Sequence, residues 1–155
     1  MSRAFVKESD TSAPPPERMV AEGRNPVTRA GYARIAAEVA RLEAALKGGP
    51  DALLRETLER DLRYWAVKKA SAEIVAPPTG DAVAFGHRVT LARGGGGQAS
   101  REQIFRIVGE DEANPPRGLV SIRSPLAQAI LGARVGDVIE AAAPLGEIAI
   151  RAIEA

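Results

Sequence analysis

The stretch IVGEDEANPPRGLVSIRSPLAQAILGARVGDVIE, residues 107–140, decides the fold that the sequence predicts. It starts as an apolar strand, turns at the acidic run Glu110–Glu112, and passes through a Pro/Gly turn into a second short strand. Ser124 and Pro125 then suit the start of a short helix, because serine is a good N-cap and proline at the first helical position needs no N–H partner. Apolar residues at 126, 127, 130 and 131 give that helix one apolar stripe, and Gly132 ends it. Strands around one short helix predict an α+β domain.

Several short sequence motifs in this stretch also match those of a known protein family. They are IVGEDEA at 107–113, SPLA at 124–127, LG at 131–132 and VGDV at 135–138, preceded by FG at 85–86 and VTL at 89–91. From about Val83 onward the chain therefore resembles the C-terminal domain of the bacterial Gre transcript-cleavage factors (GreA/GreB). An unrelated small α+β domain with a common acidic turn is the alternative interpretation.

The resemblance implies an FKBP-like C-terminal domain and bacterial RNA polymerase as the partner. Because the family's sequence motifs are present in this domain, we expect it to contribute most of the affinity for the polymerase. Asp111, Ser124 and Pro125 lie in the two best-matched corners and are the predicted partner-binding residues. Each also has a purely structural explanation, as a turn carboxylate, an N-cap and an N1 proline.

Composition limits the remaining possibilities. The 155 residues provide one ordinary domain or two small ones, and 45% of them are hydrophobic but only 4% aromatic, so any core is mostly aliphatic. The formal net charge of +1 argues against binding driven by bulk attraction to nucleic acid. There is no cysteine, no apolar run near the roughly 18 residues of a membrane span, and no signal-peptide core. These features predict a cytoplasmic protein.

Two amphipathic helices are predicted ahead of the C-terminal domain. After Thr28, a suitable cap, apolar residues recur at steps of three and four as far as Lys47, where two glycines end the helix. Pro50 is placed to start a second helix, whose last turns carry Lys68 and Lys69 and whose apolar stripe is Leu54, Leu58, Leu62 and Trp65. A short connection between helices of similar length predicts an antiparallel hairpin, a short coiled coil. Residues from about 25 onward follow the element order of Gre factors.

The domain boundaries follow from these elements. We predict a flexible tail over 1–25, the helical hairpin over 26–75, a linker over 76–80 and the Gre-type domain over 81–155. Phe5 and Val6 are either part of a disordered start or a docking segment for a partner. Tyr64 and Trp65 are the candidates for contact between the hairpin and the domain, and residues 94–97 are predicted to form a glycine-rich hairpin turn.

The hairpin tip departs from the family's pattern. In the family, two tip acids spaced by three residues enter the secondary channel of the polymerase and help hold Mg²⁺ at its active centre, so that the polymerase cleaves its own transcript. Here the weak tip candidates are Asp51 and Glu56, which are five residues apart and do not share a helical face. A capping or helix-dipole role explains Asp51 equally well. We therefore predict weak or absent cleavage stimulation.

The same residues bear on other possible functions. The chain is expected not to be an enzyme and to have no cofactor of its own, with Mg²⁺ shared with the polymerase active centre and only indirect contact with nucleic acid. The alternative with the same C-terminal module is a relative of the regulators of nucleoside diphosphate kinase. A prolyl isomerase needs an aromatic pocket, for which the domain offers only Phe85 and Phe105. DNA binding by the hairpin is disfavoured by its nine basic and seven acidic residues, and the single histidine, His87, is expected at the surface or in a turn rather than in a metal site.

Overall fold

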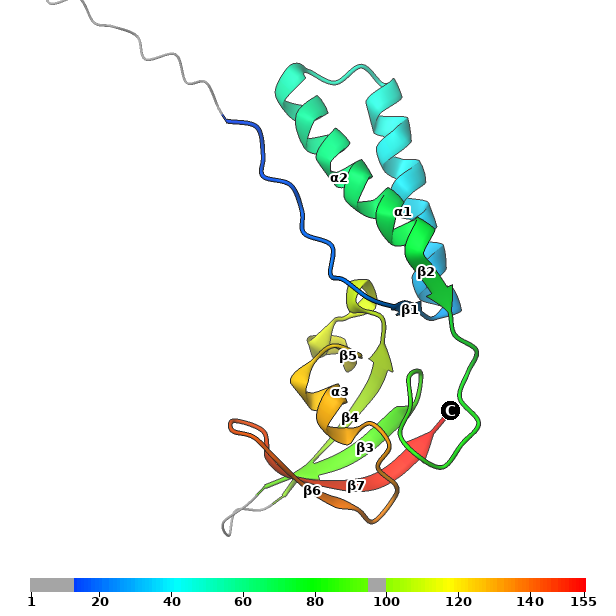
Figure 1. The fold of residues 1–155 in the computed structure, drawn as a ribbon, viewed down its shortest axis with the longest axis vertical. Coiled ribbons are helices and arrows are strands. Elements are labelled where there is room, and N and C mark those ends of the chain that lie inside the picture. The colour runs from blue at the N-terminus through cyan, green and yellow to red at the C-terminus, as the bar shows by residue number, and fades with distance from the viewer. Residues whose placement is uncertain (1–12, 95–99) are drawn as a thin grey trace, which may run out of the picture.

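The computed structural model describes residues 13–94 and 100–155. Two long helices stand over a small α+β domain, and the chain crosses between the two parts near β1 and β2 (Figure 1). The predicted mixed α+β class is confirmed. Phe5 and Val6, and most of the predicted glycine turn, lie outside the described residues.

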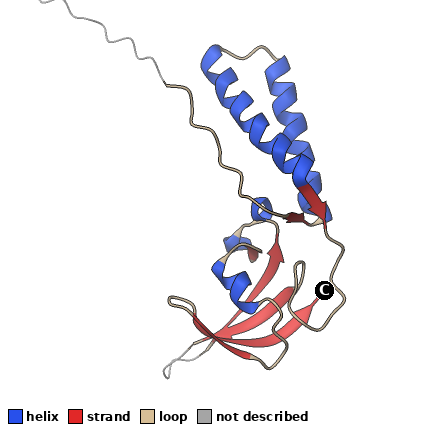
Figure 2. Ribbon diagram, viewed as in Figure 1, coloured by secondary structure: helices blue, strands red, loops and turns tan. Residues whose placement is uncertain are grey.

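The two helices are α1 (Arg29–Lys47) and α2 (Ala52–Ser71), which we call the helix pair. Thr28 caps α1 as predicted, because its hydroxyl oxygen accepts from the Gly31 N–H at 2.9 Å. The helices lie side by side (Figure 2), and the buried side chains of the helix pair include Ile35, Val39 and Leu42 of α1 and Leu58 of α2. Of the apolar stripe predicted for α2, only Leu58 is buried; Leu62 and Trp65 are half-buried, and Leu54 is 48% exposed.

Both ends of the second helix differ from the prediction. Pro50 does not start it; Asp51 is the N-cap and α2 begins at Ala52. The helix stops at Ser71, and Ala72–Ile74 forms β2, which pairs in parallel with β1 (Asn25–Val27). The predicted 26–75 segment therefore contains a two-stranded sheet at its base. Such pairing between residues 47 positions apart leaves no periodic signal in three-residue strands.

The C-terminal part is a five-stranded sheet of order β5-β4-β3-β7-β6. Its strands are β3 (Arg88–Arg93), β4 (Arg101–Val108), β5 (Leu119–Ser121), β6 (Val138–Ala141) and β7 (Gly146–Glu154). Only β4 and β5 run parallel; the other pairs are antiparallel. The single turns η1 (Glu110–Glu112) and η2 (Pro115–Arg117) connect β4 to β5.

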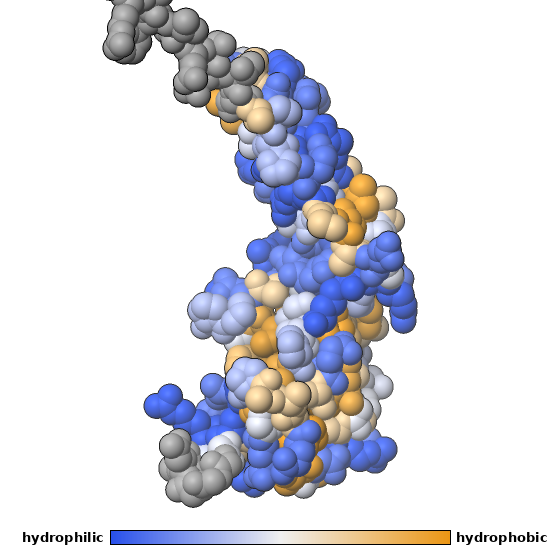
Figure 3. Space-filling view, turned by 60° about the vertical axis from the view of Figure 1, so that its left-hand side comes forward, coloured by the Kyte–Doolittle hydropathy of each residue, from blue (hydrophilic) through white to orange (hydrophobic). Residues whose placement is uncertain are grey.

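The helix α3 (Pro125–Ile130) covers one face of this sheet (Figure 1). Ser124 caps it by accepting from the Ala127 N–H at 3.2 Å, and Pro125 occupies its first turn, as predicted. The core between α3 and the sheet is aliphatic; its fully buried members include Val89, Leu91, Ile107, Ala127, Ile130, Ile148 and Ile150. Hydrophobic surface gathers over this domain, whereas the helix pair presents mainly hydrophilic surface (Figure 3).

The described part of the predicted tail runs beside α2 (Figure 1). Glu17 pairs with Arg63, Arg18 lies 3.7 Å from Asp61, and the Arg18 guanidinium stacks 3.7 Å from the centre of the Tyr64 ring. Exposed ion pairs of this kind hold a segment only weakly. No helix among residues 13–94 and 100–155 is long and apolar enough to cross a membrane.

Candidate functional site

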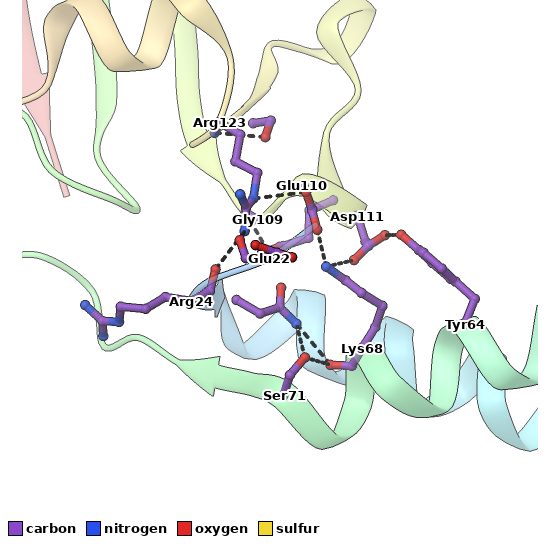
Figure 4. Close-up of polar contacts among 12 residues, drawn as sticks. Glu22, Arg24, Tyr64, Lys68, Ser71, Gly109, Glu110, Asp111 and Arg123 are labelled. Atoms are coloured by element: carbon purple, nitrogen blue, oxygen red, sulfur yellow. Dashed lines mark hydrogen bonds and ion pairs between the residues drawn. The ribbon is translucent and has the colours of Figure 1, made fainter. Parts of the chain in front are cut away.

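The acidic corner Glu110–Glu112 lies where the helix pair meets the C-terminal domain. Its central cation is Lys68, whose side chain is only 1% exposed although it sits in the last turns of α2. The Lys68 ammonium donates to the Glu110 carboxylate and lies 3.1 Å from Oδ2 of Asp111 (Figure 4). A buried ammonium requires such partners, because an unpaired charge in a dry interior is strongly unfavourable. We call this set of contacts the junction.

Asp111 is held from both sides. Its Oδ1 accepts from the Tyr64 hydroxyl at 2.6 Å, while its Oδ2 has only the ion pair with Lys68 and no aligned donor among the described residues. The Asp111 side chain is 9% exposed. The contact confirms Tyr64 as a residue that joins the helix pair to the domain. Trp65 lies next to it and lines, with Asp111, a hollow of about 300 Å³ against α1.

The third acid, Glu112, clamps the start of α1. Its Oε2 accepts from the backbone N–H groups of Thr28 and Gly109, each at 3.1 Å, and its Oε1 accepts from the Thr28 hydroxyl. A Cβ on Gly31 would lie 2.1 Å from Cδ of Glu112, so only glycine permits this approach. The carboxylate thereby satisfies an N–H at the helix start that has no intrahelical partner and favours the positive end of the helix dipole.

Two further residues complete the junction. Nε of Arg123 lies 3.1 Å from Glu110, and its Nη2 donates to the carbonyl oxygens of Glu22 and Arg24 at 3.0 Å each. From the helix side, the Asn25 amide donates to the Lys68 carbonyl at 3.0 Å and to the Ser71 hydroxyl at 3.2 Å. The junction therefore fixes residues 22–28, both helices and the acidic corner in one arrangement (Figure 4).

The ionisation of the Tyr64 hydroxyl provides a measurable property of the junction. Burial, followed by the hydrogen bond to Asp111, raises the pKa of Tyr64 above its ordinary value. Because the folded state holds this proton more tightly, the stabilisation is complete below the unfolded-state pKa of about 10 and is lost as pH rises through the folded-state pKa. We expect the phenolate absorbance, taken as the difference between the protein and Tyr64→Phe, to appear only well above pH 10. Asp111→Asn should move it downward; a Tyr64 titration near 10 in the folded protein would contradict the junction geometry.

The predicted tip acids take structural positions. Asp51 is the N-cap of α2, where its Oδ1 accepts from the Leu54 N–H at 2.9 Å, and Glu56 is exposed further along the helix. The structure does not bring them together. No group of three potential metal ligands occurs among the described residues. Lys47 and Arg55 stand near the same turn, which makes it a poor place for a cation.

The predicted partner-binding residues lie in two neighbouring corners. Asp111 is in the junction, while Pro125 is exposed and lines a hollow of about 520 Å³ between α3 and the β6–β7 turn. Arg123 connects the corners, since it precedes Ser124 in the chain and pairs with Glu110. Their part in polymerase binding stays a prediction.

Sequence reasoning missed the main cation of the junction. Lys68 was assigned to the helix dipole, although it lies three residues beyond Trp65 on the apolar stripe, and a lysine there signals a buried partner. His87 is in a turn as predicted but is 2% exposed rather than at the surface. Its Nδ1 accepts from the Ala84 N–H at 3.0 Å, so it serves the turn.

Comparisons with known proteins agree with the resemblance. The family model described as "Transcription elongation factor, GreA/GreB, C-term" matches residues 77–155. GreA of Hyphomonas neptunium is 32% identical over 154 residues, which cover 84% of this chain and 96% of that protein. The chain belongs to the GreA/GreB family of transcription elongation factors.

Further relatives of this Gre-family chain are similar over different lengths. GreB of Xanthomonas axonopodis pv. citri is 40% identical over 92 residues, which cover 58% of this chain and 53% of the relative. Among solved structures, GreA factor homolog 1 (Gfh1) of Thermus thermophilus is 22% identical with a TM-score of 0.41; the match covers 86% of this chain and all of that one.

Proposed function

We propose that this protein regulates transcription elongation by binding bacterial RNA polymerase at or near its secondary channel, with weak or no stimulation of transcript cleavage. Family membership supports the partner, since the relatives are transcription elongation factors. In this proposal the helix pair serves as the family's coiled-coil hairpin and the five-stranded sheet with α3 as its FKBP-like domain. The protein acts in the cytoplasm on the polymerase, is not an enzyme itself and holds no cofactor of its own.

The proposed weak or absent stimulation of transcript cleavage rests on the residues at the tip of the helix pair. Support for cleavage requires two carboxylates that converge on one cation from a rigid support. The Asp51 carboxylate is engaged in capping α2, and Glu56 is displaced from it along the helix. Gly49, at φ +71°, and Gly48 precede this cap, so the connection offers no second acid that is held beside Asp51.

The junction supports a fixed insertion geometry. With 19 residues, α1 extends for about 28 Å at roughly 1.5 Å per residue. A lever of that length turns a small change of angle at its base into a large displacement of the tip. Lys68 of α2 pairs with Glu110, and Glu112 accepts from Thr28 at the start of α1. These two contacts therefore determine where the tip lies once the C-terminal domain is bound.

A cleavage assay tests the proposal. Purified protein added with Mg²⁺ to a backtracked elongation complex is expected to leave the rate of transcript shortening within about twofold of the polymerase alone, because no convergent acid pair is present. In excess over an active cleavage factor, it is expected to slow shortening by occupying the same entrance.

The matched variant is Asp51→Asn, which keeps an N-cap of nearly equal strength but removes the charge. It should fold normally and change neither result. Strong acceleration by the unaltered protein that Asp51→Asn abolishes would refute the proposed inactivity of the tip. Failure of the full chain to bind the polymerase at all would refute the proposed partner.

A further inference from the structure

Three arginines surround a hollow at one end of the C-terminal sheet. Arg88 on β3, Arg106 on β4 and Arg117 in η2 line it together with Ile104, Gly118 and Leu119, and its volume is about 250 Å³. We call it the arginine hollow. It lies on the sheet face opposite the core, since Val89 and Ile107, the chain neighbours of Arg88 and Arg106, are fully buried under α3.

The strand register forces two of these cations together. Arg88 and Arg106 are direct partners in the antiparallel β3–β4 ladder, and like charges placed directly opposite each other destabilise a sheet. Glu154 is the partner of Arg88 on the other side, in β7. None of the three arginines lies within 4.0 Å of a carboxylate side chain among residues 13–94 and 100–155. Seven of the other described arginines do, whereas Arg29, Arg34, Arg55, Arg93, Arg101 and Arg151 do not.

Arg106 is held in place by backbone oxygens alone. Its Nη1 donates to the Gly86 carbonyl at 2.7 Å and its Nη2 to the Ala155 main-chain oxygen at 3.4 Å. These bonds orient the guanidinium group. Arg106 also lines a neighbouring hollow of about 340 Å³ with Arg29 at the start of α1, so the two hollows meet at Arg106.

We propose that the arginine hollow binds phosphate groups. Planar guanidinium groups match phosphate oxygens with paired hydrogen bonds and remain charged at any physiological pH. An anion placed between Arg88 and Arg106 removes their mutual repulsion, and Arg117 closes the third side. Ile104, 51% exposed at the rim, offers an apolar contact for a base or ribose next to the phosphate. The phosphate comes from a free nucleotide or from a nucleic-acid backbone, and the inference does not depend on polymerase binding.

Titration of the full-length protein, labelled with nitrogen-15, tests the proposal with inorganic pyrophosphate as one probe and a single-stranded RNA oligonucleotide as the other. Saturable amide shifts are expected at Ile104, Gly118 and Leu119, at constant ionic strength. Saturation by both probes with similar affinity identifies a free phosphate anion as sufficient; much tighter binding of the RNA identifies the nucleic-acid backbone as the source.

The test variant is Arg88→Gln/Arg117→Gln, which spares the structural bonds of Arg106. It should weaken pyrophosphate binding at least about tenfold, since each charge-assisted hydrogen bond is among the strong ones. For RNA, the slope of log K against log salt should shrink by about 1.4, or about 0.7 for each lost phosphate contact. The matched control Arg55→Gln/Lys69→Gln removes the same charge from exposed positions on α2 and should change neither quantity.

Absence of saturable shifts with both probes overturns the proposal. So does equal weakening by the test and control variants, which would show attraction by net charge alone. Loss of polymerase binding by the test variant, with no phosphate binding by the unaltered protein, would instead assign the arginines to an acidic protein surface.

Discussion

Replacement of Lys68 by methionine is expected to lower the free energy of unfolding by about 3–5 kcal/mol, the range for removing one partner of a buried ion pair. Methionine fills a similar volume, so packing is largely kept. The loss arises because Glu110 and Asp111 lose their cationic partner at a site where the side chain of Asp111 is only 9% exposed. Arg123 compensates Glu110 in part, whereas Asp111 is left with the Tyr64 hydroxyl alone.

Urea denaturation, monitored by tryptophan fluorescence, measures this loss of stability with a probe that lies close to the junction. Trp65, the single tryptophan, lies on α2 beside Tyr64, with ring centres 5.2 Å apart, so its emission reports the junction. Lys69→Met is the matched control, because Lys69 is the exposed neighbour, and should shift stability by no more than about 0.5 kcal/mol.

A rescue variant separates charge from packing. Lys68→Met combined with Asp111→Asn removes the uncompensated carboxylate, so it should recover part of the stability that the single change loses. Equal stability of Lys68→Met and Lys69→Met would show that the ion pairs of Lys68 contribute nothing to the junction.

Gly31→Ala is expected to destabilise the protein, although replacing a helical glycine by alanine usually raises the free energy of unfolding. Alanine in place of glycine inside a helix ordinarily stabilises by about 1 kcal/mol. Here the new Cβ would lie 2.1 Å from Cδ of Glu112, so the carboxylate must leave its position. It then gives up the N–H groups of Thr28 and Gly109 and the Thr28 hydroxyl. A net loss of about 2–4 kcal/mol is expected, since hydrogen bonds to charged groups are worth about 1.5–3 kcal/mol each and solvent recovers part of it.

Thermal or urea unfolding of three variants checks this expectation. Gly48→Ala makes the same chemical change at the end of the same helix, with right-handed φ of −70° and no neighbour closer than 3.3 Å, and should be nearly neutral. Glu112→Ala alone should destabilise, and Gly31→Ala in that background should cause little further loss because the clash is gone. Strict additivity of the two changes would mean that the close approach of Gly31 and Glu112 does not exist in solution.

Local signals made much of the architecture predictable from the sequence. Thr28 and Ser124 cap the helices assigned to them, because an N-cap bond spans only three residues and leaves a readable pattern. Apolar residues that recur three and four positions apart as far as Lys47 predicted α1 for the same reason, since this pattern is also local. The acidic corner and the Ser124-Pro125 corner also carried the family resemblance, which the comparisons confirmed.

The role of the acidic corner depends on contacts between residues that are far apart in the sequence. Glu112 is 84 positions from Thr28, and Glu110 is 42 from Lys68, so no local pattern pairs them. The same holds for the parallel pairing of β1 with β2 and for the meeting of Arg88 with Arg106 across a strand ladder. Capping and helical periodicity act between neighbours in the chain, so both can be inferred from the amino-acid sequence. Burial of a lysine, the need for glycine at 31 and the clustering of arginines depend on which surfaces meet after folding, because a charge or a Cβ is favourable or not only with respect to the atoms that surround it.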